Sequence, residues 1–79
     1  KPLLNKFFIK LDSVDIWNES NLELCIKNFI NEENIKFKIF GRPIRHLLTN
    51  NKNGISISLV MFILGKEITY LRINNYINN

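Results

Sequence analysis

The sequence has 79 residues, a formal net charge of +4 at pH 7, one cysteine and one histidine. One cysteine excludes an internal disulfide framework, and one cysteine with one histidine cannot supply the four ligands of a structural zinc site. The longest apolar run, Leu59 to Leu64, is far shorter than the roughly 20 residues that cross a bilayer, so we expect a soluble domain in a reducing cytoplasm.

The chain opens at Lys1 without an initiator methionine, and its first ten residues lack the apolar core of a secretion signal. A chain of this size is one domain or part of one. We therefore interpret residues 1–79 as a domain or subdomain excised from a larger protein.

Helical spacing of apolar residues predominates and predicts an all-α, compact bundle of about five short helices. The first helix is expected to begin near Pro2, a residue suited to a first turn, and to fade by Asp15. Its apolar side carries Leu4, Phe8 and Leu11.

The second helix is expected to begin just after Trp17, in one of two registers. Asn18 as N-cap would pair Trp17 with Leu22 in a hydrophobic staple, whereas Ser20 as N-cap would form a capping box with Glu23. Either register gives one apolar stripe, made of Leu22, Cys25, Ile26, Phe29 and Ile30.

The segment Asn34–Phe40 alternates apolar residues with Lys36 and Lys38. It has the pattern of a strand, but no second strand candidate exists to pair with it, so an extended connector is preferred. Phe37 and Phe40, flanked by these lysines, are candidate base-stacking residues, although a core position is the more usual one for phenylalanine.

Pro43 suits the first position of a third helix, which ends near Thr49. In that register its buried side is Ile44, Leu47 and Leu48. Arg42 becomes the N-cap and Arg45 lies in the first turn, where the helix dipole disfavours a cation by about 0.3 to 1 kcal/mol. A bound phosphate or base would offset that penalty.

A polar turn, Asn50–Gly54, precedes a nearly all-apolar segment, Ile55–Leu64. We expect this segment to be a fourth helix surrounded by the others, with Gly65 as its C-terminal stop. A fifth helix begins at Lys66, and its tail is expected to fray. Its inward residues are predicted to be Ile68, Leu71, and Tyr76 or Ile77.

Charge is distributed unevenly along the chain. Every acid except Glu67 lies within the first 33 residues. The stretch from Asn34 to Lys66 contains no acid and six basic residues: Lys36, Lys38, Arg42, Arg45, Lys52 and Lys66. Such asymmetry indicates a polyanion-binding face. The simpler alternatives are a solvated surface and arginines paired with Glu32 or Glu33.

Four short motifs follow one another in the chain: Trp17, "NLEL" from Asn21, "RPIRHLLTN" from Arg42 and "ILGKE" from Ile63. Their order and the gap-free spacing from Pro43 to Lys66 resemble the C-terminal anticodon-binding domain of bacterial-type glutamyl-tRNA synthetases. The resemblance implies an all-α domain that grips the anticodon arm of the tRNA for glutamate.

The resemblance also implies binding residues. Arg45 aligns with a family arginine that hydrogen-bonds anticodon bases, and its planar guanidinium suits that task. Arg42 replaces a family glutamine and is a phosphate-contact candidate; Thr49 shares the face of both arginines. The family's hydroxyl residue and proline are here Gly54 and Ile55.

Further candidates follow from the same alignment. Ser56 or Ser58 is expected to replace the hydroxyl that Gly54 lacks. Ile57 and Ser58 occupy positions that touch a splayed base in the family. Lys36, Lys38 and Lys52 are candidate contacts to the RNA backbone.

No catalytic residue and no metal site is expected. His46 has neither an acid nor a serine at a defined spacing, and the sequence contains no nucleotide-binding signature. By resemblance, ATP with Mg binds elsewhere in a parent enzyme, which we expect to be a cytoplasmic monomer without membrane contact. The alternative function is a small helical protein-interaction domain whose basic face binds an acidic partner.

Overall fold

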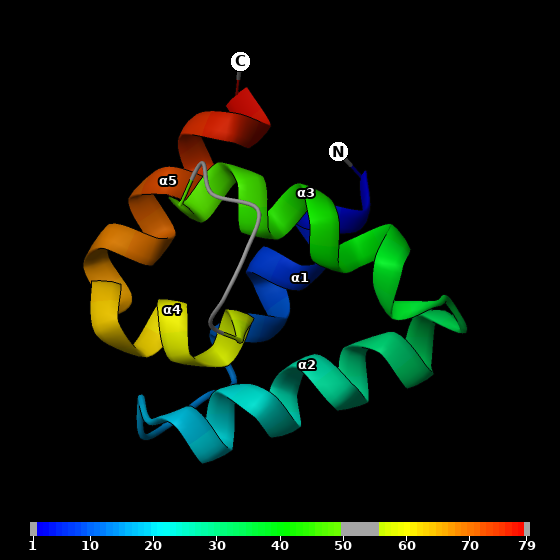
Figure 1. The fold of residues 1–79 in the computed structure, drawn as a ribbon, viewed down its shortest axis with the longest axis horizontal. Coiled ribbons are helices and arrows are strands. Elements are labelled where there is room, and N and C mark those ends of the chain that lie inside the picture. Colours follow the sequence, from blue (N-terminus) through cyan, green and yellow to red (C-terminus); the bar gives the residue numbers. More distant parts are fainter. Residues whose placement is uncertain (1, 50–55, 79) are drawn as a thin grey trace.

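Five helices make up the described part of the chain, residues 2–49 and 56–78, in a computed structural model (Figure 1). They are α1 (Pro2–Leu11), α2 (Glu19–Glu33), α3 (Phe37–Thr49), α4 (Ile57–Leu64) and α5 (Lys66–Asn78). These residues contain no strand, so the all-α prediction is confirmed for them.

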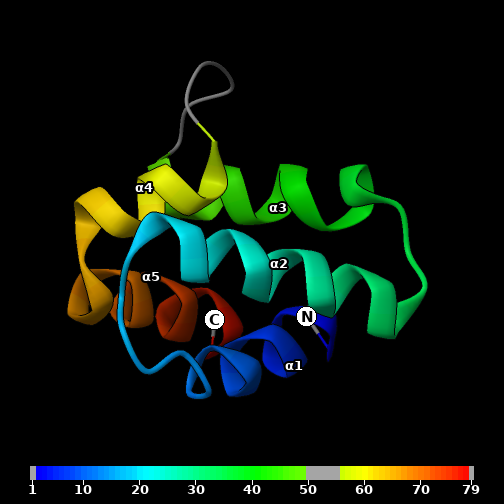
Figure 2. The same ribbon diagram turned by 90° about the horizontal axis from the view of Figure 1, so that it is seen from below.

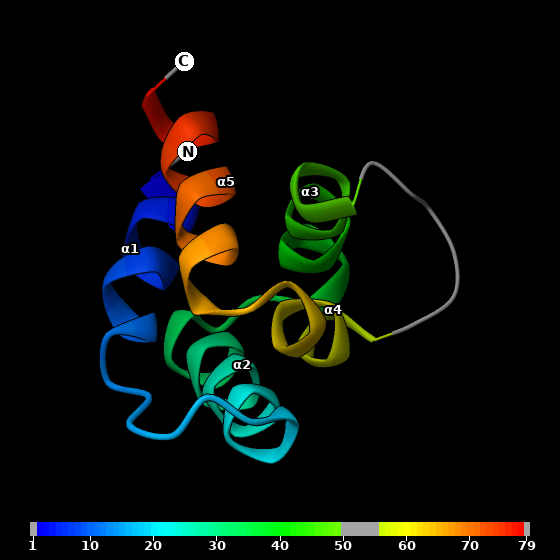
Figure 3. The same cartoon turned by 90° about the vertical axis from the view of Figure 1, so that its left-hand side faces the viewer.

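The helices form two layers closed at one end by α2. Figure 2 shows α3 and α4 on one side and α1 and α5 on the other, and Figure 3 shows α2 running across the end of both layers. Helices α1 and α4 each contact three other helices. None of the described helices has the length and apolar character that spanning a bilayer requires.

Three phenylalanine rings from different helices meet in the core. The ring centroid of Phe7 in α1 lies 5.2 Å from that of Phe29 in α2 and 4.7 Å from that of Phe40 in α3. The Phe29 and Phe40 centroids are 5.5 Å apart. Such tilted and edge-on ring contacts stabilise a core beyond their buried area alone. The sequence analysis placed Phe8 on the buried side of α1, whereas Phe7 is fully buried and Phe8 only partly.

Helix α2 follows the first of its two predicted registers. Asn18 is the N-cap, and its side chain accepts a hydrogen bond of 2.8 Å from the backbone N–H of Asn21. Ser20 therefore lies inside the helix, and the capping-box register is wrong. Asn34 ends the helix in the left-handed conformation that asparagine tolerates.

Helix α3 begins at Phe37, earlier than predicted, so Asn34–Phe40 is not an extended connector and Pro43 lies inside a helix. An interior proline loses the hydrogen bond to residue i−4 and costs about 3 kcal/mol or more. The extra turn buries Phe40 completely against Phe7 and Phe29. Burial of that aromatic ring offsets the cost, which is why the proline did not mark the start of the helix.

Helix α4 is apolar on nearly all sides, but it is partly exposed rather than surrounded. Its Ile57, Val60 and Met61 are buried, but the side chains of Phe62 and Ile63 are 47% and 64% exposed. Gly65 ends the helix as predicted, with a φ of 87° that favours glycine.

The inward face of α5 differs from the prediction. Thr69 and Ile73 are fully buried, while Ile68, Leu71 and Tyr76 are exposed; of the two alternatives at the end of the helix, Ile77 packs against the core as predicted. Thr69 can face the core because its hydroxyl donates to the Met61 carbonyl at 3.4 Å. A polar residue whose hydroxyl has a hydrogen-bond partner can therefore be buried, and a prediction that considers apolar residues alone does not find it.

Candidate nucleic-acid interface

One side of α3 carries a row of cationic and hydroxyl side chains. Lys38, Arg42, Arg45 and Thr49 are spaced four, three and four residues apart, which places them on one face of the helix. The buried residues Phe40, Ile44 and Leu48 occupy the other side. Because α3 begins at Phe37, Lys38 joins the two arginines. We call these four residues the α3 face.

Arg45 is the half-buried member of the α3 face, while Lys38 and Arg42 are exposed. Its Nε atom is buried and has no hydrogen-bond partner among the described residues. Arg45 lies in the interior of α3, outside both its first and its last turn, so the expected first-turn penalty does not apply. A buried donor without a partner is unfavourable, but the Nε atom is reached by a ligand only if the Arg45 side chain moves.

The arginines of the α3 face do not pair with the acids that the sequence analysis considered. Glu33 accepts from Lys6 at 3.2 Å and Glu32 from Lys10 at 3.1 Å. These are the ion pairs found among residues 2–49 and 56–78. The cations of α3 therefore have no carboxylate partner in that part of the chain.

The last turn of α3 is held from two sides. The Thr49 hydroxyl donates to the Arg45 carbonyl at 3.0 Å, and Nη1 of Arg72 in α5 donates to the Leu48 carbonyl. The last four carbonyls of a helix lack partners inside the helix, so the bond from Arg72 to Leu48 satisfies an acceptor that would otherwise need water, while the Arg45 carbonyl lies one residue before these four. Sequence reasoning missed Arg72, because nothing in the sequence pairs it with a residue in another helix.

The start of α4 corrects two candidate contacts. The side chains of Ile57 and Ser58 are each only 3% exposed, so neither can present its side chain to a base. Ser56 is the N-cap, and its hydroxyl accepts from the backbone N–H of Leu59 at 3.3 Å. Of the two serines proposed to supply a hydroxyl, Ser56 holds the capping position. The candidates Lys52, Gly54 and Ile55 lie outside the described residues.

The first turn of α3 separates the two aromatic candidates. Phe40 is fully buried, which excludes it as a base-stacking residue, whereas Phe37 is 48% exposed. A Cβ added to the buried Gly41 would lie 2.7 Å from Cε2 of Phe37, so the ring lies across this glycine. Lys36 and Lys38 beside it are exposed.

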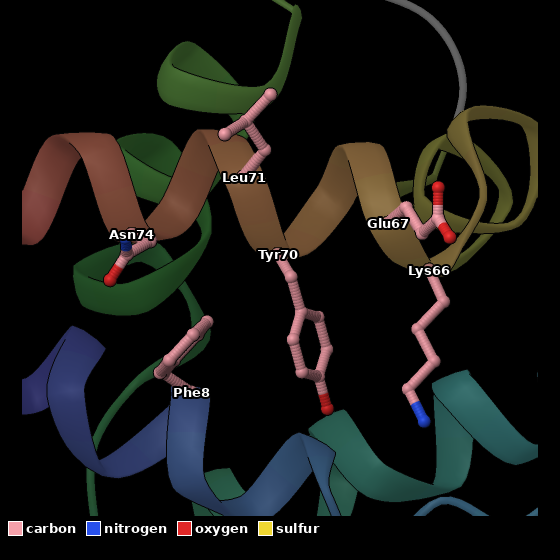
Figure 4. Close-up of a pocket in the computed structure, with 6 residues that line it drawn as sticks. All are labelled: Phe8, Lys66, Glu67, Tyr70, Leu71 and Asn74. Carbon is pink, nitrogen blue, oxygen red and sulfur yellow. The ribbon is translucent and has the colours of Figure 1, made fainter.

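A hollow of about 580 Å³ between α1 and α5 contains none of the candidate residues (Figure 4). It is lined by Phe8, Lys66, Glu67, Tyr70, Leu71 and Asn74. Burial, followed by the 2.7 Å hydrogen bond to Asp12, raises the pKa of the Tyr70 phenol above its ordinary value. Burial likewise raises the pKa of the Cys25 thiol, which argues against a reactive cysteine.

Two of the motifs that carry the family resemblance meet at the C-terminal end of α4. Nε1 of Trp17 donates to the Met61 carbonyl at 3.0 Å, and the backbone N–H of Gly65 donates to the same carbonyl at 3.0 Å. Trp17 therefore caps the C-terminal end of α4, directly before the Gly65 of "ILGKE". The tryptophan and glycine of the two motifs act on one acceptor, a structural rather than an RNA-binding role.

An all-α domain with an acid-free row of cations along one helix is of the class that binds nucleic-acid backbones. Comparison with known proteins narrows this class. The model of the family described as "Anticodon binding domain" matches residues 1–77, and the chain belongs to that family.

The curated relatives are much longer than this chain and match it over nearly all of its residues. The chain is 40% identical over 78 residues to "Glutamate--tRNA ligase 2" of Helicobacter acinonychis (strain Sheeba) and to "Glutamate--tRNA ligase 1" of Helicobacter pylori (strain J99 / ATCC 700824). It is 33% identical over 79 residues to "Glutamate--tRNA ligase" of Ruthia magnifica subsp. Calyptogena magnifica.

These alignments cover 99% to 100% of this chain but 17% of each relative. The chain is thus homologous to the C-terminal part of glutamate–tRNA ligases. No solved structure gave a significant match. The family membership does not favour the alternative of a protein-interaction domain.

Proposed function

We propose that this domain binds the anticodon loop of the tRNA for glutamate and so positions that tRNA for glutamylation by a catalytic domain of the same ligase. The observation that carries the proposal is the α3 face: Lys38, Arg42 and Arg45 in one row, without a carboxylate partner among the described residues. Such a row offers phosphates a continuous contact, and the planar, half-buried guanidinium of Arg45 suits the reading of a base.

Within this proposal the residues have different tasks. Arg45 reads an anticodon base, and Arg42 and Lys38 bind phosphates, as do Lys36 and Lys52. Thr49 and the backbone around Gly54, Ile55, Ile57 and Ser58 complete the contact. Because the sequence contains no nucleotide-binding signature, ATP and Mg bind elsewhere in the ligase. We propose that this ligase is a cytoplasmic monomer.

Substitution of Arg45 in the full-length ligase tests the proposal. Arg45→Ala should weaken tRNA use by about 1 to 3 kcal/mol and relax discrimination at the third anticodon base, since that is the range for one base contact. Arg45→Lys keeps the charge but loses the planar fork, so it should recover general affinity without selectivity. Aminoacylation kinetics with tRNAs altered at that base measure both effects.

Two lysines serve as matched controls for charge alone. Lys36→Ala and Lys52→Ala should weaken the binding of all tRNAs alike and flatten the salt dependence. If Arg45→Ala lowers affinity equally for every anticodon variant, base reading is wrong and Arg45 contributes only charge.

A further inference from the structure

Helix α5 connects the two helices that flank residues 50–55. Arg72 donates to the Leu48 carbonyl at the end of α3, and Thr69 donates to the Met61 carbonyl of α4. Figure 1 shows the end of α3 beside α5. One helix thus holds both neighbours of a connection that carries candidate binding residues.

Arg72 is well placed to transmit rigidity because its own position is fixed. Its chain neighbour Ile73 is fully buried, as is Thr69 one turn earlier. Its acceptor is fixed too, since the Leu48 side chain is also fully buried. The hydrogen bond therefore joins the exposed Arg72 side chain, on an anchored backbone, to an anchored carbonyl, whereas a contact between two exposed side chains would restrict neither.

The Leu48 carbonyl lies beside the C-terminal end of the α3 face. Leu48 lies between Arg45 and Thr49, and the Thr49 hydroxyl donates to the Arg45 carbonyl within this turn. The last turn of a helix frays when its carbonyls have no partner. Fraying here would move Thr49 and change the direction in which the guanidinium of Arg45 points.

We propose that Arg72 is a positioning residue for RNA recognition, which holds the last turn of α3, and with it Arg45 and Thr49, in the binding geometry. This inference rests on the proposed function of the α3 face. Arg72 acts through the Leu48 carbonyl and does not itself contact the RNA. Base reading depends on placement within fractions of an ångström, so loosening this turn should affect selectivity more than overall affinity.

The test uses the full-length ligase and labelled tRNAs that differ at the third anticodon base. Arg72→Met keeps the aliphatic stem and removes the donor and the charge. It should lower the ratio of affinities for correct and altered tRNA by about 3-fold to 10-fold, which corresponds to the net contribution of one ordinary hydrogen bond. Arg72→Lys retains a donor and should restore most of the ratio.

Lys66→Met is the matched control, because it removes the same charge from the same helix at a position where the ammonium lies over the Tyr70 ring, 5.6 Å from its centroid, and not at the end of α3. It should leave the ratio unchanged. Thermal melting of each variant checks that the domain is folded at the assay temperature. If Arg72→Met is unfolded at that temperature, the affinity ratio of Arg72→Lys is compared with that of the unaltered protein. A ratio close to that of the unaltered protein supports the role of the donor, and a loss of the ratio contradicts it.

The outcomes separate this inference from the proposed function. If Arg45→Ala loses selectivity and Arg72→Met keeps it, the positioning role is wrong and the proposed function stands. If Arg45→Ala keeps selectivity, the proposed function itself fails. An equal loss of affinity for all tRNAs in Arg72→Met, with a flatter salt dependence, would make Arg72 a phosphate contact and also overturn the positioning role. A loss of selectivity in Arg72→Lys equal to that in Arg72→Met would do the same.

Discussion

The part of the molecule formed by α1 and α2 and the part formed by α3 and α4 differ in whether their cations are paired with carboxylates. In the first part Lys6 and Lys10 reach across from α1 to Glu33 and Glu32 of α2. In the second, Lys38, Arg42 and Arg45 lie along one helix with no carboxylate partner among the described residues. Charges that neutralise each other contribute a little to stability, whereas unneutralised like charges repel and are retained where a polyanion binds.

Both parts share one core, and the largest expected effect comes from breaking it. Phe40 belongs to the α3 side and contacts Phe7 and Phe29 of the other side, with no exposed surface. Phe40→Ala should lower the free energy of unfolding by about 3 to 5 kcal/mol, measured by urea denaturation, because it leaves a cavity where the two parts meet.

Phe62→Ala is the control for Phe40→Ala. The sequence alone placed Phe62 in a central helix, where its loss would cost about 2 to 5 kcal/mol, as would that of Met61. Since the Phe62 side chain is 47% exposed and Met61 is fully buried, only Met61→Ala should now fall in that range. An equally large loss for Phe62→Ala would contradict the observed packing of α4.

The next effect is smaller and separates the charges of the two parts. Lys38→Ala should reduce the slope of log affinity for tRNA against log salt concentration by about one, the value for one phosphate contact. Lys6→Ala should leave that slope unchanged and cost less than about 1 kcal/mol of stability, because its ion pair with Glu33 is largely exposed. Titrations at several salt concentrations measure both slopes, and equal changes would mean that the two parts do not differ in function.

The number of helices and most of their ends could be predicted from the sequence. Local chemistry determines those ends: Asn18 caps α2 with its own side chain, and Gly65 ends α4 with a positive φ. The start of α3 could not be predicted, because it depends on the contact of Phe40 with two rings far away in the chain. Local preference for proline at a first turn is weaker than that burial.

The candidate site shows the same division. The periodicity of the third helix already placed Arg42, Arg45 and Thr49 on one face, and the earlier helix start adds Lys38 to it. The burial of Ile57 and Ser58 and the bond from Arg72 to Leu48 depend on how helices pack, so sequence spacing does not contain them. The RNA-binding roles of these residues stay predictions.

The smallest expected effect concerns Asp12, which lies between α1 and α2 and has no ion pair with a cation among residues 2–49 and 56–78. Asp12 accepts a hydrogen bond of 2.7 Å from the Tyr70 hydroxyl of α5. Burial and this bond raise the pKa of the Tyr70 phenol above its ordinary value of about 10. Above that pH the unfolded chain releases the phenolic proton while the folded chain keeps it, so the free energy of unfolding should fall as pH rises.

Tyr70→Phe removes the phenolic proton and should therefore remove this part of the alkaline loss. The Cys25 thiol, whose pKa is also raised, is present in both proteins and cancels in their difference. At neutral pH the variant should be less stable by about 0.5 to 1.5 kcal/mol, the value of one hydrogen bond, and at the lower end because this bond is exposed. Urea denaturation from about pH 8 to pH 11 should show the two stabilities converging above the ordinary phenol pKa of about 10. Parallel curves over that range would mean that Tyr70 titrates alike in the folded and unfolded chains, and that its bond to Asp12 does not join α5 to the acidic part in solution.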